Sequence, residues 1–184
     1  MFFDKKNNNL NTARQIIQHT GLKENLAILE EKRHLVPVEP REILKLVMAL
    51  STCNLVQTMK AEFITRKLND ETRDDIAREY VLESFKNQDL VKFKGPAELE
   101  ALRKGVMGVV AELQKFWGNT EDPQGSGPGP RYFCVKEILA RLGGGTNYEV
   151  HDALFELMYI QYRNYMKFFR EMLKEPEVDP GAGI

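Results

Sequence analysis

The chain has few residues of the kinds that build cross-links and metal centres. Two cysteines and three histidines occur among its 184 residues. This composition excludes a disulfide-stapled scaffold and is too sparse for a structural zinc cluster. Both cysteines, Cys53 and Cys134, lie in apolar stretches. We therefore expect buried, reduced thiols in a cytoplasmic protein that holds no metal and no cofactor.

An excess of either charge is also lacking. The chain has 26 basic and 27 acidic residues, for a net charge of −1. A protein that holds nucleic acid through its phosphates normally carries a basic surface, so we do not expect a nucleic-acid partner. No run reaches the 18 or so apolar residues that a membrane span requires. The start of the chain also lacks the apolar run of a signal peptide, so a soluble protein away from membranes is expected.

Helical periodicity covers most of the chain and predicts an all-α, multi-helix bundle of about six helices. A short extended piece is expected at residues 91–94, where apolar and basic residues alternate. The expected helices span residues 13–34 (as one helix or as two divided at Gly21), 40–68, 71–87, 96–117, 131–142 and 147–174.

One Gly- and Pro-rich segment, residues 118–130, cannot support a helix or a core. It separates an N-terminal helical part, residues 1–117, from a C-terminal part, residues 131–184, that consists of a helical hairpin and an acidic tail. We expect the two parts to form one folded unit.

Two local patterns predict how particular helices begin and pack. Capping boxes are predicted at Thr12–Gln15 and at Thr146–Glu149, each with a hydroxyl followed three residues later by Gln or Glu. The helix over 96–117 carries a line of small residues, where we expect the close approach of another helix or, alternatively, a hinge. These residues are Ala97, Ala101, Gly105 and Gly108.

The last expected helix, residues 147–174, is rich in Tyr, Phe and Met at alternating steps of three and four. Core packing is the plainest explanation, but aromatic residues and Met are also enriched at the centres of interfaces. We therefore hypothesise a non-catalytic protein-binding or assembly (adaptor) subunit that uses this helix to bind another protein or a second copy of itself. The candidate partner-binding residues are Tyr148, Tyr159, Tyr162, Tyr165 and Phe169.

A second hypothesis comes from residues 135–157, where a short helix, a glycine turn and a second helix are expected in that order. This outline resembles the helix–turn–helix shared by many DNA-binding domains and implies a transcriptional regulator. The second helix would meet the bases with Asn147, Tyr148, Glu149, His151 and Asp152, and with no Arg or Lys. Because carboxylates repel phosphate, this regulator is the alternative and not the leading hypothesis.

A third hypothesis is a small-ligand binder or an enzyme with a pocket near His151, to which Tyr162 would contribute. A histidine on an apolar helix stripe is more often a core residue whose hydrogen bonds are satisfied. No nucleophile motif occurs in the chain. The single Glu-x-x-His pair, Glu31 with His34, is too little for a di-iron bundle. A catalytic role is therefore not favoured, although sequence alone does not show which side chains meet in space.

Overall fold

A computed structural model describes residues 5–20, 33–86, 95–118, 129–143 and 147–174. They form seven α-helices and one turn of 3₁₀-helix, and none of these described residues lies in a β-strand. The prediction of an all-α, multi-helix bundle is confirmed. The elements are α1 (Lys5–Thr20), η1 (Arg33–Leu35), α3 (Pro40–Thr58), α4 (Glu62–Thr65), α5 (Asp70–Lys86), α6 (Pro96–Gly118), α7 (Pro130–Arg141) and α8 (Tyr148–Leu173).

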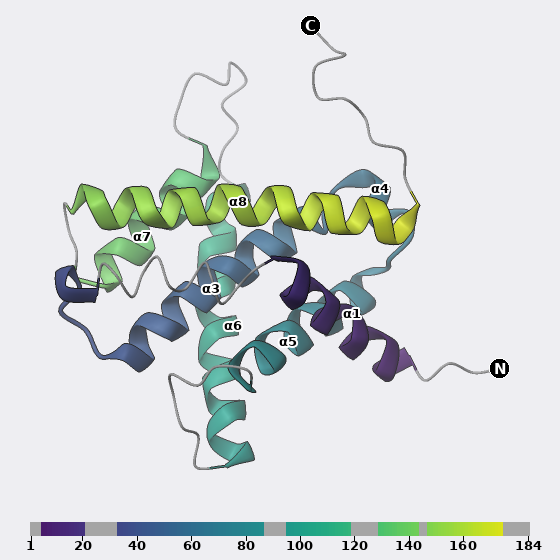
Figure 1. Ribbon diagram of the computed structural model, residues 1–184, viewed down its shortest axis with the longest axis horizontal. Helices are drawn as coiled ribbons and strands as arrows, with labels where there is room; N and C mark the ends of the chain where they lie inside the picture. The colour runs from purple at the N-terminus through teal and green to yellow at the C-terminus, as the bar shows by residue number, and fades with distance from the viewer. Residues whose placement is uncertain (1–4, 21–32, 87–94, 119–128, 144–146, 175–184) are drawn as a thin grey trace, which may run out of the picture.

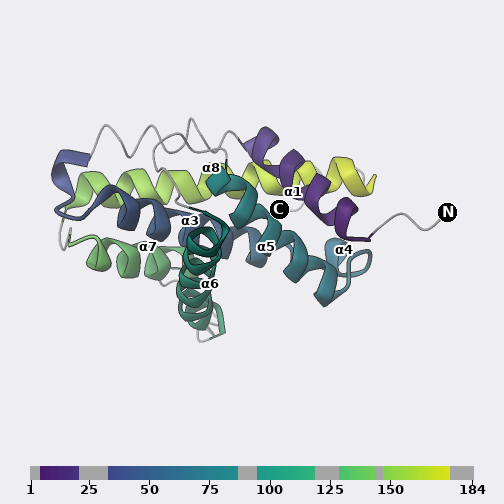
Figure 2. The same ribbon diagram turned by 90° about the horizontal axis from the view of Figure 1, so that it is seen from below.

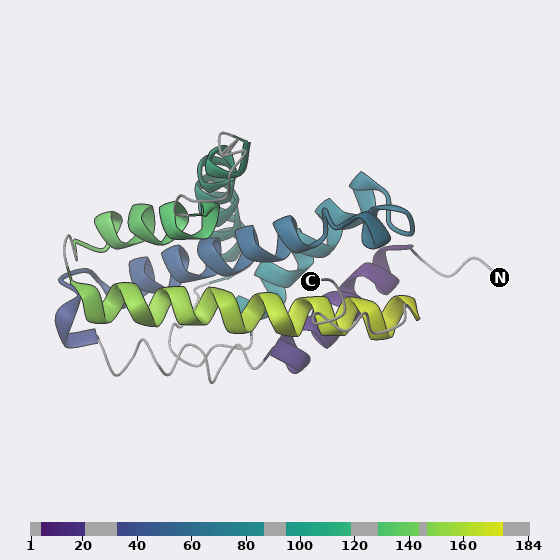
Figure 3. The same ribbon diagram turned by 90° about the horizontal axis from the view of Figure 1, so that it is seen from above.

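Helix α8 crosses the full width of the molecule along one side (Figure 1). It packs on α7 and α3 towards its start and on α1 towards its end. Seen from below and from above, α6 lies on the far side of α3 from α8 (Figures 2 and 3). Helix α3 is thus the centre of the bundle, and α8 is an outer helix.

The central helix α3 is enclosed on all sides in its middle. Every residue from Leu46 to Leu55 is buried. Its hydroxyl groups bond to carbonyls of the same helix: Thr52 Oγ1 donates to the Met48 carbonyl at 2.7 Å, and Thr58 Oγ1 donates to the Asn54 carbonyl at 2.8 Å. These bonds satisfy buried hydroxyls, so the helix continues through a run of weak helix formers.

The helix predicted over residues 40–68 is interrupted after Thr58, and that prediction is wrong. The Met59 N–H still bonds four residues back, to Leu55, but the N–H groups of Lys60 and Ala61 bond three residues back, which ends the helix in a tight turn. Arg73 of α5 donates to the Met59 carbonyl at 2.9 Å. It thereby satisfies a carbonyl that a continuing helix would have bonded.

Helix α1 begins at Lys5, well before the expected start at residue 13. Thr12 is therefore inside the helix, where its hydroxyl donates to the carbonyl of Asn8 at 3.0 Å. The predicted capping box at this position is wrong. Residues 21–32 of the helix predicted over 13–34 lie outside the described residues.

The line of small residues on α6 does not receive a neighbouring helix. A Cβ atom on Gly105 would lie 3.5 Å from Lys45 Cδ, and one on Gly108 would meet nothing within 4 Å. Ala97 and Ala101 are exposed. The prediction of a close helix approach along the whole line is therefore wrong. The neighbouring apolar stripe of α6 faces the bundle and leaves Ala97, Ala101 and Gly108 at the surface, and only Gly105 is half-buried, beside the Lys45 side chain of α3.

Two predicted features fall largely outside the described residues. These are the extended piece at 91–94 and the linker at 118–130, of which only the ends belonging to α6 and α7 are described. Within the described ranges, no helix combines the length and the apolar character needed to cross a membrane.

Candidate functional site

Helix α8 carries all the residues predicted from sequence as site residues, and an asparagine fixes its start. Asn147 Oδ1 accepts hydrogen bonds from the N–H groups of Glu149 at 3.1 Å and Val150 at 3.3 Å. The cap is therefore one residue later than the predicted box, which placed it at Thr146. At the other end, Lys174 adopts a left-handed conformation (φ 56°) and ends the helix.

The inner face of α8 is part of the core. Tyr165 and Phe169 are completely buried and pack in the same cluster as the apolar residues of α3 and α5. Their assignment to a partner-binding surface is therefore corrected, since side chains enclosed by the chain's own helices cannot contact a partner.

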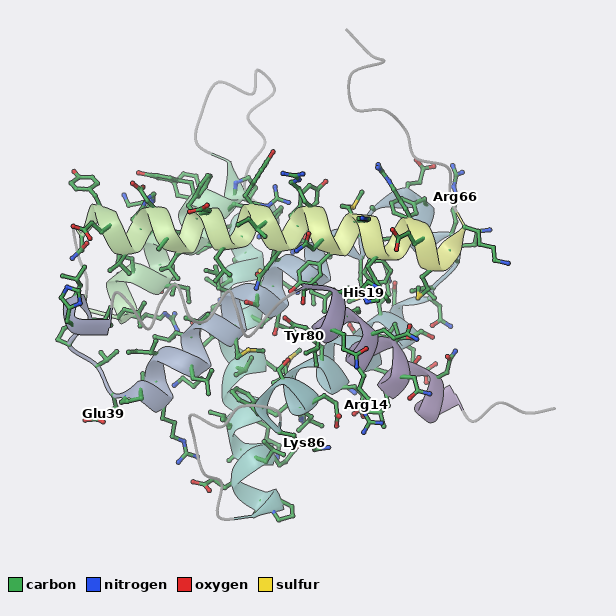
Figure 4. The ribbon with its side chains drawn as sticks, viewed as in Figure 1. Arg14, His19, Glu39, Arg66, Tyr80 and Lys86 are labelled. Carbon is green, nitrogen blue, oxygen red and sulfur yellow. The ribbon has the colours of Figure 1, made fainter. Side chains whose placement is uncertain are left out.

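A buried chain of hydrogen bonds joins this inner face to α3 and α5. Gln161 Nε2 donates to Ser51 Oγ at 2.8 Å, and the Tyr165 hydroxyl donates to the Ser51 carbonyl at 3.4 Å. The hydroxyls of Tyr165 and Tyr80 are 2.9 Å apart, and Tyr80 is labelled in the interior in Figure 4. Burial raises the pKa of both tyrosines, so both stay protonated. This network holds α8 in a fixed rotation.

Tyr162 is engaged inside the molecule by an arginine. The Arg131 guanidinium lies 4.2 Å from the centroid of the Tyr162 ring and 5.1 Å from that of Trp117. Arg131 Nε also donates to Asn54 Oδ1 at 3.4 Å. Burial lowers the pKa of Arg131. Tyr162 thus lies where α6, α7 and α8 pack together, and it is only partly exposed.

His151 and Tyr162 do not form one pocket. They lie about three turns apart on α8, roughly 16 Å along its axis. His151 contacts the rings of Tyr132 and Phe155, and its Nδ1 atom is 3.2 Å from Asp152 Oδ1. A cavity of about 270 Å³ lies elsewhere, between α3, α5 and α6. Its lining residues are Val56, Met59, Lys60, Asp70, Arg73, Asp74 and Gln114.

Five rings form a continuous chain of contacts across α6, α7 and α8. We call these residues, Phe116, Phe133, Tyr132, His151 and Phe155, the aromatic patch. Successive ring centroids in that order are 6.1, 5.7, 5.4 and 6.2 Å apart. Phe133 and Phe155 are 36% and 41% exposed. Phe155 lies in the aromatic-rich stripe predicted for the last helix, although it was not a candidate partner-binding residue. Phe133 was not predicted, because the contribution of α7 becomes apparent only when it packs beside α8.

The outer face of α8 borders this patch and carries two more exposed rings. Tyr148 is 79% exposed and Tyr159 is 57% exposed. Figures 1 and 3 show that α8 lies along one side of the molecule, with the other labelled helices on its opposite side. The remaining exposed residues of the helix, which complete what we call the outer face, are Asp152, Glu149, Glu156, Arg163, Lys167 and Glu171.

The charges of the outer face are divided along the helix. The exposed charges from Glu149 to Glu156 are all acidic, and those from Arg163 onward are basic except for Glu171, which pairs with Lys167 at 3.9 Å. The start of α8 would enter the DNA groove in a helix–turn–helix. Its carboxylates are poorly suited to phosphate.

Both cysteines are free and buried, as predicted. Cys134 Sγ donates to the Leu113 carbonyl at 3.6 Å. The hydrogen bond with Cys134, together with burial, raises the pKa of the Cys53 thiol. The described residues hold no group of three His, Cys, Asp or Glu side chains that could bind a metal ion.

The candidate site is therefore a surface, made of the aromatic patch and the outer face of α8. Comparison of the chain with family models, with curated proteins and with solved structures finds no match.

Proposed function

We propose that the protein is a non-catalytic assembly subunit that binds a partner protein through the outer face of α8 and the adjoining aromatic patch. The observation that carries this proposal is the group of exposed rings on one side of a single long helix: Tyr148, Phe155 and Tyr159. Isolated exposed apolar residues are ordinary, but a contiguous aromatic surface is typical of interaction sites.

The anchoring of α8 supports this function energetically. Its inner face is fixed by the core and by the hydrogen bonds of Gln161 and Tyr165. The rings on the other side therefore stand on a rigid element and lose little conformational entropy on binding. Complete burial of one such ring stabilises a complex by about 1.5–3 kcal/mol. Tyr148 and Tyr159 are the residues from which most of this gain is expected.

The proposal is tested by placing a photo-reactive phenylalanine derivative at Tyr159 and, separately, at Tyr148 in the full chain expressed in its native cell. Illumination is expected to give a covalent adduct with one defined polypeptide from both positions. The matched control is the same derivative at Ala101, an exposed residue of α6. The proposal fails if neither tyrosine position gives an adduct, or if Ala101 gives the same one.

A further inference from the structure

We infer that the partner of the outer face is a second copy of this chain, bound with its α8 antiparallel to the first. This inference rests on the proposed function and specifies the occupant of that surface. It goes beyond the exposed rings because it follows from the order of charges along α8.

Six of the seven charged residues of α8 form two triplets that mirror each other, and the seventh, Glu171, lies outside them and pairs with Lys167. The centre of the pattern lies between Tyr159 and Ile160. Each acidic residue before this centre has a basic counterpart the same number of residues after it. At 3.6 residues per turn, all six positions fall within about 60° of arc. Five of these side chains are exposed and Arg170 is half-buried. The three mirrored pairs are Glu156 with Arg163, Asp152 with Lys167, and Glu149 with Arg170.

Mirrored charges of opposite sign are what a two-fold interface between identical helices requires. In such an interface the same patch is used on both copies, and each contact occurs twice. If two α8 helices run antiparallel with the two-fold axis between Tyr159 and Ile160, every acidic residue of a triplet lies opposite a basic residue of the other copy. A parallel arrangement would place acid against acid and base against base. The charge order therefore selects one orientation and one register.

Apolar residues border the charged arc on one side of the helix. Tyr159 would meet its own copy next to the two-fold axis, with Phe155 and the half-buried Met166 beside it. Exposed ion pairs contribute little affinity individually. The rings would therefore supply most of the attraction, and the charges would set orientation and register.

The test uses two charge-reversal variants of the purified full chain and sedimentation velocity. One is Asp152→Lys with Glu156→Lys, and the other is Arg163→Glu with Lys167→Glu. All four side chains are exposed, so the fold should persist, and circular dichroism checks this. The wild-type chain is expected to be a dimer whose dissociation constant rises with salt. Each variant alone should be monomeric, because like charges then meet across the interface.

An equimolar mixture of the two variants provides the decisive measurement. One chain then presents only basic residues at these four positions and the other only acidic ones, so a heterodimer should form at least as tightly as the wild-type dimer. The inference is overturned if the wild-type chain stays monomeric at 100 µM, if both variants remain dimeric, or if the mixture stays monomeric. A monomeric wild type that still gives a Tyr159 adduct with a different protein would overturn this inference and leave the proposed function standing.

Discussion

The buried tyrosine pair between α5 and α8 shows how strongly the stability of the fold can depend on a single hydroxyl group. Tyr80 and Tyr165 are both completely enclosed, with their hydroxyls 2.9 Å apart and their rings in an edge-to-face arrangement. Because Tyr165 also donates to the Ser51 carbonyl, the proton between the two hydroxyls belongs to Tyr80. Removing the Tyr165 hydroxyl would leave that donor without a partner in the core.

We expect Tyr165→Phe to lower the free energy of unfolding by about 1–3 kcal/mol, the usual loss when a buried polar group becomes unpaired. Tyr80→Phe should cost less, since Tyr165 keeps its bond to Ser51. The double variant should be less destabilised than the sum of the two, because it leaves no orphaned hydroxyl. Urea unfolding of the wild type, the two single variants and the double variant measures this double-mutant cycle. Strictly additive losses in the free energy of unfolding would contradict a coupling between the two hydroxyls.

At the scale of the helices, periodicity in the sequence was sufficient for α5, α6, α7 and α8, whose apolar stripes lie against the bundle. It failed where contacts with other helices determine the end of a helix. The end of α3 depends on Arg73, which comes from a helix later in the chain. The candidate surface could be predicted only in part for the same reason. Periodicity places Tyr159 and Tyr165 on one aromatic-rich helix, but packing decides which of them is enclosed.

Two glycines of α6 provide a test at the level of the helix. Alanine at Gly105 or Gly108 should raise the free energy of unfolding by about 0.5–1 kcal/mol each, because the unfolded chain loses conformational freedom and the space for a methyl group exists. Gly143→Ala is the opposing control. It should destabilise, since that residue has φ +69° and its Cβ would lie 3.0 Å from Pro37 Cγ. Thermal unfolding followed by circular dichroism distinguishes the two outcomes, and destabilisation at Gly105 and Gly108 would show that α6 is closely packed there.

For the whole molecule, the inferred dimer couples stability to concentration. Association favours the folded state by mass action, so the melting temperature should rise as the protein is concentrated from 1 to 100 µM. The Asp152→Lys, Glu156→Lys variant should melt at the same temperature throughout this range. Differential scanning fluorimetry and calorimetry cover the two ends of the range. A wild-type melting temperature that does not change with concentration would argue for a monomer.

The burial of both natural thiols has a practical consequence. A maleimide or a nitroxide reagent will find no ready target at Cys53 or Cys134 while the chain is folded, since neither side chain is accessible. A cysteine introduced on the outer face, for example at Tyr159, would then be the preferred point of attachment. The wild-type background is thus already suited to single-site labelling, and spin–spin distances could be recorded without first replacing a native cysteine.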